Sequence, residues 1–132
     1  MSNSFIPEFE VYQLLKQADI KTPLYSFIQQ ETDCSNTPFI NGQAVVLKGM
    51  ATDLWHKSDN GALAFCDFSV TELEKRHTEM SQAVGKKFNW LGTLVTERVS
   101  FKSTKGAPSE IFISLQRDKY SSATISLGFG GL

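Results

Sequence analysis

The sequence is poor in several features that mark common classes of protein. It has only two cysteines, Cys34 and Cys66, and their spacing fits neither a metal site nor a disulfide scaffold, so we expect reduced thiols. No apolar run approaches transmembrane length, and the first residues lack the basic and apolar regions of a signal peptide. We therefore expect a cytoplasmic protein that does not bind membranes.

The sequence also lacks an excess of either charge. Thirteen lysines and arginines stand against 14 aspartates and glutamates, which gives a formal net charge of -1. This balance provides no general attraction to nucleic acid or to an anionic membrane, although it leaves room for a local positive pocket that holds a phosphate. With 132 residues, 41% of them hydrophobic, the chain can fold as one domain with a real core.

Two segments have the apolar spacing of helices. The first covers Val11–Ala18, and Pro7 shortly before it suits a helix start. The second covers Val70–Val84, where Ser69 and Glu72 form a capping box at the start. One side of this second helix should be buried, and that side carries Val70, Leu73, His77, Met80 and Val84.

Short apolar runs predict the strands. Four of them are "KTPLYSFI", "AVVLKG", "GALAFCDF" and "WLGTLVTERVSF", and the second has the pattern of a strand covered on both faces. The segments Ile111–Leu115 and Ala123–Leu127 alternate apolar and polar residues and should form an antiparallel pair. The order of elements predicts an α+β fold with helices packed on a mixed or antiparallel sheet.

Lys48 stands where the apolar run "AVVLKG" is about to end. A lysine binds phosphate as a compact point charge, and the end of a strand beside a loop is a suitable place for that group. The alternative is a solvated lysine that closes a strand and has no ligand. Spacing alone leaves both interpretations open.

A dense polar stretch follows that strand. His56 and Lys57 can both face an anion, and Ser58 can donate a hydroxyl to it, but the same residues also suit a plain polar turn. Because Gly49 and Gly61 flank the stretch and few residues in it must be buried, we expect it to be a mobile loop.

Two further features have competing interpretations. Glu97 interrupts an apolar strand, where it can bond a ligand hydroxyl, pair with Arg98 or Lys48, or simply face outward. The final "GFGGL" can cradle phosphate with its backbone N–H groups, but it lacks the Walker lysine and is also compatible with a flexible terminus.

Taken in order, several stretches resemble one family. They are "FEVYQLLKQADIKTPLY", "AVVLKGMATDLWHKSDNGALAF", "LVTERV" and "EIFISLQRDKYSSATISLGFGGL". The set resembles the ATP-grasp domain of the nucleoside-diphosphate-forming acyl-CoA synthetases, the acetate–CoA ligase (ADP-forming) group, which is related to succinyl-CoA synthetase β chains. The resemblance implies that residues 1–132 form a single ATP-grasp N-terminal lobe, apparently truncated after the glycine loop at 128–131.

The resemblance also implies roles for individual residues. Lys48 would contact the nucleotide phosphates, and His56 would handle the phosphoryl group as the catalytic residue. Glu97, with the backbone around Arg98 and Val99, would border adenine and ribose. The remaining nucleotide-binding positions implied in this way are Lys57, Ser58, Gly128, Gly130 and Gly131. One departure is "KYSSA" where the family usually has a phenylalanine-glycine-proline stretch.

The family's reaction converts an acid, CoA and ATP to acyl-CoA, ADP and phosphate. By resemblance, the partners of this chain would be ATP or ADP, a second ATP-grasp lobe that carries the Mg²⁺ ligands, and a CoA-ligase region or subunit that carries a phosphohistidine. We therefore expect the chain alone to be inactive. Two other possibilities are a synthetase remnant that acts as the sensor of a protein acyltransferase, and a non-enzymatic docking module.

Overall fold

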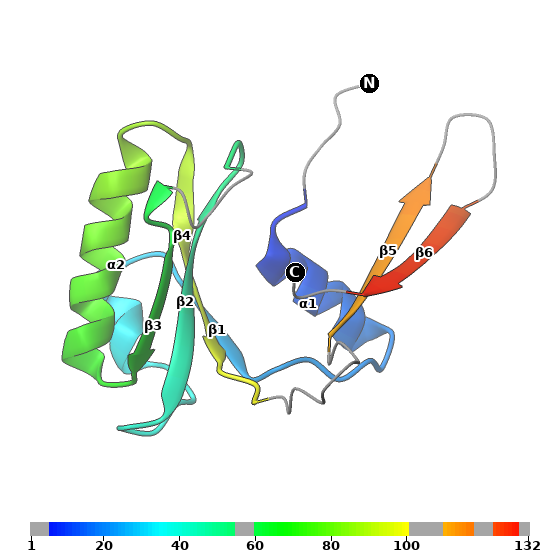
Figure 1. Ribbon diagram of the computed structural model, residues 1–132. Coiled ribbons are helices and arrows are strands. Elements are labelled where there is room, and N and C mark those ends of the chain that lie inside the picture. The colour runs from blue at the N-terminus through cyan, green and yellow to red at the C-terminus, as the bar shows by residue number, and fades with distance from the viewer. Residues whose placement is uncertain (1–5, 55–59, 101–109, 118–122, 130–132) are drawn as a thin grey trace. The chain divides into compact units, whose positions relative to one another are not determined.

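The computed structural model describes residues 6–54, 60–100, 110–117 and 123–129, and the chain divides into two compact units, Met1–Arg98 and Val99–Leu132 (Figure 1). In the first unit, two α-helices accompany a four-stranded sheet, and the described part of the second unit is a β-hairpin. This arrangement confirms the predicted α+β class. In the described part of the chain, no helix has the length and apolar character needed to cross a membrane.

The sheet of the first unit is antiparallel throughout, with the strand order β1–β4–β2–β3. Its strands are β1 (Tyr25–Ile28), β2 (Ala44–Ala51), β3 (Leu63–Asp67) and β4 (Trp90–Glu97). The apolar pattern predicts all four strands, but β2 extends two residues beyond its predicted run, to Ala51. Because β4 and β2 are central and are the longest strands of this sheet, they set the register of the others.

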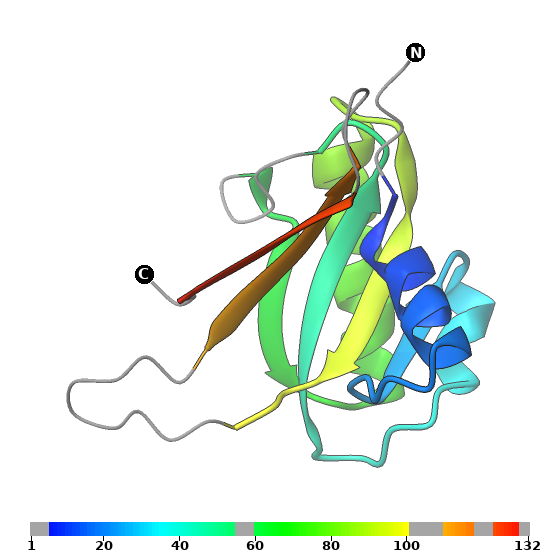
Figure 2. The same cartoon turned by 90° about the vertical axis from the view of Figure 1, so that its right-hand side faces the viewer.

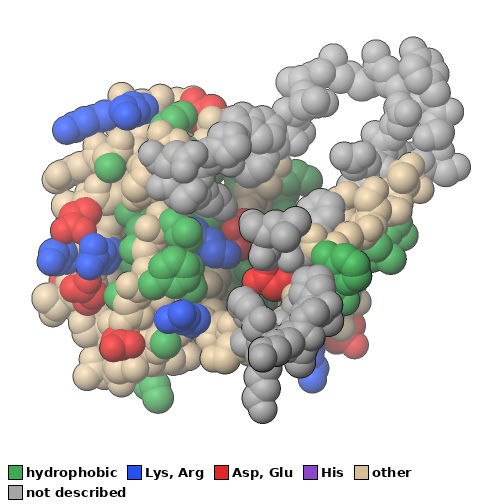
Figure 3. Space-filling view, in the orientation of Figure 1, with side chains coloured by type: hydrophobic (Ala, Val, Ile, Leu, Met, Phe, Trp, Pro, Cys, Tyr) green, Lys and Arg blue, Asp and Glu red, His purple; other side chains and the backbone are tan. Residues whose placement is uncertain are grey.

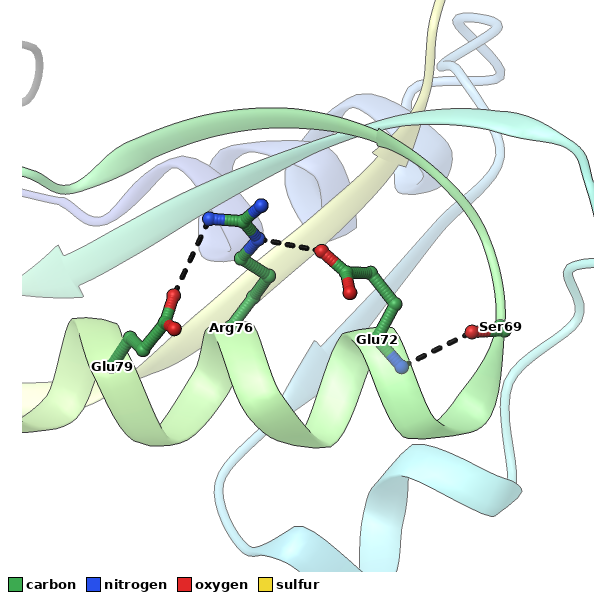
Figure 4. A network of polar contacts seen from close by, with 4 residues as sticks. All are labelled: Ser69, Glu72, Arg76 and Glu79. Atoms are coloured by element: carbon green, nitrogen blue, oxygen red, sulfur yellow. Dashed lines mark hydrogen bonds and ion pairs between the residues drawn. The ribbon is translucent and has the colours of Figure 1, made fainter.

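Helix α2 (Val70–Gly85) begins at the cap that the sequence predicts. The Ser69 hydroxyl accepts a hydrogen bond from the backbone N–H of Glu72 at 3.1 Å, a contact worth about 1 kcal/mol (Figure 4). The carboxylate of Glu72 does not complete the predicted capping box. It accepts a hydrogen bond from Arg76 Nε at 2.7 Å, and Arg76 also reaches Glu79 at 3.3 Å, so the charges pair along the exposed side of the helix.

The core lies between α2 and one face of the sheet, which we call the α2 face (Figure 1). Four of the five helix residues predicted to be buried are buried, namely Leu73, His77, Met80 and Val84. The prediction for Val70 is wrong, because this first residue of the helix is 38% exposed. The main cluster consists of Ile28, Cys34, Phe39, Val45, Leu47, Phe68, Leu73, Met80 and Val95.

Strand β2 continues three residues beyond Lys48, so the lysine lies inside the strand and not at its end. Gly49 fits here because a Cβ at this position would be 3.0 Å from Ala62 Cβ and 3.1 Å from a Trp90 ring carbon. Met50 and Leu54 are also buried. The predicted mobile loop is therefore wrong for Gly49, Met50 and Ala51, which lie in β2, and for the buried Leu54, whereas Thr52 and Asp53 between them are exposed.

A short 3₁₀ helix, η1 (Glu31–Ser35), follows β1, and the apolar patterns of the sequence do not predict it. The carboxylate of Asp33 caps it by accepting the backbone N–H groups of Gln30 and Gln29 at 2.9 and 3.0 Å, and these bonds lower the pKa of Asp33. Cys34 is fully buried beside α2, and this burial raises the pKa of its thiol to about 11. Both cysteines are free, as predicted.

Helix α1 (Glu8–Gln17) lies on the sheet face opposite α2, which we call the α1 face (Figures 1 and 2). Pro7 caps the helix, which starts three residues before the predicted Val11. The rings of Phe9 and Phe27 stack with their centroids 3.9 Å apart, and those of Tyr12 and Tyr25 lie 4.9 Å apart. Since α1 has no buried residue, these ring contacts are important for its attachment to the sheet.

Charged side chains of both signs are interspersed over the side of the molecule that carries α2 (Figure 3). No broad field of one sign covers the described atoms of this view, in agreement with the net charge of -1. This surface has no electrostatic preference for a polyanion.

The second unit contributes the hairpin of β5 (Ile111–Arg117) and β6 (Ala123–Phe129), which confirms the predicted antiparallel pair. Its register places Ile111 opposite Phe129 and Ile113 opposite Leu127, so these side chains share one face with Ile125. All five are between 67% and 74% exposed. The hairpin therefore presents an apolar face to solvent.

The buried His77 gives the first unit a pH-dependent stability. The residue is 5% exposed, and Nδ1 lies 2.9 Å from the Thr93 hydroxyl. Burial lowers its pKa below the ordinary 6.5, although the nearby carboxylates of Glu31 and Asp33 oppose this shift. His77 therefore binds a proton more readily in the unfolded chain than in the folded chain. As a result, the free energy of unfolding falls as the pH drops below about 6.5.

We expect urea unfolding to show this loss between pH 7.5 and pH 5.5 in the wild type. The variant His77→Gln keeps a polar side chain beside Thr93 but cannot titrate. It should be less stable at pH 7.5, and its stability should change less with pH over the same range. Parallel pH profiles for the two proteins would contradict the assignment.

Candidate functional site

Lys48 stands in a row of side chains that crosses the α1 face. The register pairs Lys48 with Leu94 on one side and with Leu63 on the other, so the three share a face with Phe27 of β1. The Lys48 ammonium contacts a carboxylate oxygen of Glu8 at 2.5 Å. The two side chains are 24% and 27% exposed, so this cation is half-buried on the sheet.

Glu8 reaches Lys48 from the first turn of α1. The hydroxyl of Tyr12, one turn further along, donates to the same Glu8 oxygen at 2.9 Å. Burial, together with the charge of Glu8, raises the pKa of Tyr12, so the phenol stays a donor at neutral pH. Sequence reasoning missed Glu8 because its contact with Lys48 joins residues 40 apart, and no local pattern signals it.

Arg98 follows β4 and places a second cation on the α1 face. Its backbone N–H donates to the Ala44 carbonyl at 3.0 Å. Its guanidinium carbon lies 5.5 Å from the ring centre of Phe65, which pairs with Val46 on the same face as Lys48. Lys48 and Arg98 therefore belong to one face, as a site for an anionic ligand requires.

Glu97 has a different environment. The register sets it opposite Val45, whose side chain is in the core on the α2 face. Its carboxylate accepts the backbone N–H of Leu24 at 2.8 Å, while its own N–H donates to the Leu24 carbonyl at 2.9 Å. This reciprocal pair closes the end of the β1–β4 ladder, so Glu97 does not pair with Lys48 or Arg98 as one interpretation suggested.

The other predicted positions are divided between the second unit and the undescribed parts of the chain. Val99 is 60% exposed, and Gly128 lies in β6 opposite Phe112. Five predicted site residues lie outside the described residues, namely His56, Lys57, Ser58, Gly130 and Gly131. Their assignment stays a prediction from the sequence.

An open groove of about 820 Å³ lies beside the edge strand β1. Its lining comes from the second half of α1, the following connection, β1 and Glu97. Lys16 and Lys21 contribute positive charge to it, but Lys48 does not line it. We therefore place the candidate phosphate site at Lys48 on the α1 face and not in this groove.

A metal ion has no obvious place in the described residues. Across residues 6–54, 60–100, 110–117 and 123–129, no group of three or more histidine, cysteine, aspartate or glutamate side chains is arranged to hold one. The family resemblance assigns the Mg²⁺ ligands to a second lobe and not to these residues.

The Glu97 contact predicts a stability effect that is separable from ligand binding. Glu97→Ala leaves the Leu24 N–H without its carboxylate acceptor and should cost about 1 kcal/mol in the free energy of unfolding. Glu97→Gln keeps an acceptor oxygen and should cost clearly less. Urea unfolding of both variants measures the difference. Equal stabilities for Glu97→Ala and the wild type would show that the contact contributes nothing.

Solved structures share this fold. The chain superimposes with a TM-score of 0.74 and 24% identity on the dinucleotide forming acetyl-coenzyme A synthetase 1 of Ca. Korarchaeum cryptofilum in complex with coenzyme A, Ca-AMPCP and HgCl+, covering 98% of this chain and 56% of that one. ACD1 of the same organism, in complex with coenzyme A, superimposes with a TM-score of 0.73 and 25% identity, and the match covers 97% of this chain and 54% of that one. PH1788 of Pyrococcus horikoshii Ot3 superimposes with a TM-score of 0.74 and 23% identity, and the match covers 98% of this chain and 54% of that one.

The chain thus spans about half the length of the solved structures that it matches. The family comparison covers almost every residue, because the model of the ATP-grasp domain matches residues 2–132. This match agrees with the resemblance found in the sequence and with the α+β fold of the first unit. The chain belongs to the ATP-grasp domain family.

Proposed function

We propose that this chain is the ATP-binding half of an acyl-CoA synthetase that converts an acid, CoA and ATP to acyl-CoA, ADP and phosphate. One observation carries the proposal: an ATP-grasp sheet presents a half-buried lysine, Lys48, from the middle of a central strand. The likeness to synthetases that bind coenzyme A supports the choice of reaction.

Lys48 supplies a fixed positive charge to the nucleotide phosphates. Its backbone is held by ladders to both β3 and β4, so the start of the side chain is rigidly placed. With 24% of the side chain exposed, the ammonium is partly removed from water and interacts more strongly with an anion than a fully solvated lysine does. In phosphoryl transfer, such positioned charge provides much of the rate enhancement.

Arg98 and Val99 follow the central strand β4, where we propose that the backbone borders adenine and ribose. The cation of Arg98 and the exposed side chain of Val99 give this segment a polar part and an apolar part. Glu97 holds the segment at the end of the strand through Leu24. The proposal keeps Lys57, Ser58 and the glycines at 128, 130 and 131 as further contacts and His56 as the phosphoryl-handling residue.

We propose further that the site needs protein beyond these residues. A two-stranded hairpin is marginally stable by itself, and one face of β5–β6 exposes five large apolar side chains. This exposed apolar face supports a second ATP-grasp lobe and a CoA-ligase region as partners. The Mg²⁺ ligands would lie in that second lobe.

Removal of Lys48 tests the phosphate assignment. Loss of a charge-assisted phosphate contact costs about 1.5–3 kcal/mol, so Lys48→Ala should weaken ATP binding roughly ten- to hundredfold in a calorimetric titration of the protein that includes the second lobe. Lys75→Ala is the matched control, since it removes the same charge from an exposed position on α2. It should leave ATP affinity nearly unchanged.

Equal ATP affinities for the wild type and Lys48→Ala would contradict the proposed function. An equal loss in Lys48→Ala and Lys75→Ala would attribute the effect to net charge and would also contradict it. Circular dichroism on each variant checks that the fold is intact.

A further inference from the structure

The Glu8–Lys48 ion pair places a carboxylate where the proposed function needs a phosphate. The contact is 2.5 Å, and about a quarter of each side chain is open to solvent. Carboxylate and phosphate are both oxyanions and offer the same kind of oxygen acceptor to an ammonium group. Lysine has three N–H donors, so its ammonium group could donate to a second anion while it contacts Glu8. The negative charge of Glu8 would, however, repel that anion at short range.

Glu8 is held in this position by contacts other than its charge. Its neighbour Phe9 stacks on Phe27 with an angle of 11° between the rings. Tyr12 packs against Tyr25 and donates its hydroxyl to the Glu8 carboxylate. The carboxylate is thus positioned in advance by a helix that is fastened to β1, and an incoming anion has to displace it.

We propose that Glu8 is an internal counter-ion that competes with nucleotide phosphate for Lys48 and thereby weakens ATP binding. The inference rests on the proposed function, because it takes Lys48 as the phosphate ligand. ATP has to break the Glu8–Lys48 pair before its phosphate gains the full attraction of the lysine. Glu8 then determines affinity without contacting the nucleotide.

The variant Glu8→Gln tests the competition. It keeps an oxygen acceptor for Tyr12 but removes the negative charge beside Lys48. We expect calorimetric titration to show ATP binding that is about two- to tenfold tighter than in the wild type.

The matched control is Glu10→Gln. Glu10 is exposed in the same first turn of α1, so the variant loses the same charge and the same interaction with the helix dipole. Its ATP affinity should stay close to that of the wild type.

A double-mutant cycle shows whether Glu8 acts through Lys48. In a Lys48→Ala background, Glu8→Gln should have no further effect on ATP affinity, because the competition needs the lysine. Circular dichroism compares helix content. Should Glu8→Gln not fold, Glu8→Asp shortens the reach to Lys48 while it keeps the charge, and it should tighten ATP binding to a smaller extent.

The outcomes separate this inference from the proposed function. If Lys48→Ala weakens ATP binding but Glu8→Gln binds ATP no tighter than the wild type, the inference is overturned and the proposed function stands. Equal tightening in Glu8→Gln and Glu10→Gln also overturns it, because the cause is then long-range charge. If neither the wild type nor Glu8→Gln binds ATP at millimolar concentration in a protein that also contains the second ATP-grasp lobe, both the inference and the proposed function fail.

Discussion

A charged lysine inside an antiparallel sheet requires an anion close to it. Lys48 is flanked on its own face by Leu94, which is fully buried, and by Leu63, so water reaches its ammonium only in part. Removing a charge from water is costly unless a partner compensates. Glu8 supplies that compensation. Helix α1 therefore has to lie where Glu8 can reach Lys48.

Successive side chains of each strand lie on opposite faces of the sheet, and the two faces have different environments. In β2, Val45 and Leu47 point into the dry core under α2, while Lys48 points to the α1 face. Strand β4 makes the same division at its end, where Glu97 fastens β1 through Leu24 and Arg98 lies over Phe65. A rigid core on one face thereby positions cations on the other, which a phosphate site requires.

Local patterns in the sequence predict most of the fold. Helix α2 follows from the spacing of Leu73, His77 and Met80, and the β5–β6 pair follows from strict alternation. Tertiary packing decides what these patterns miss. The "GMATDL" stretch has a loop-like composition, yet Met50, Ala51 and Leu54 are buried, and Gly49 allows close approach to Ala62. The partner of Lys48 depends on how α1 packs on the sheet, so no motif around Lys48 contains Glu8.

A structure of the chain bound to a non-hydrolysable ATP analogue tests the central claim most directly, because it locates the phosphates relative to the α1 face. The account predicts a phosphate oxygen within hydrogen-bond distance of Lys48 Nζ, with the Glu8 carboxylate moved away from the lysine. A nucleotide bound elsewhere, or one bound while the Glu8–Lys48 pair stays intact, would contradict the account.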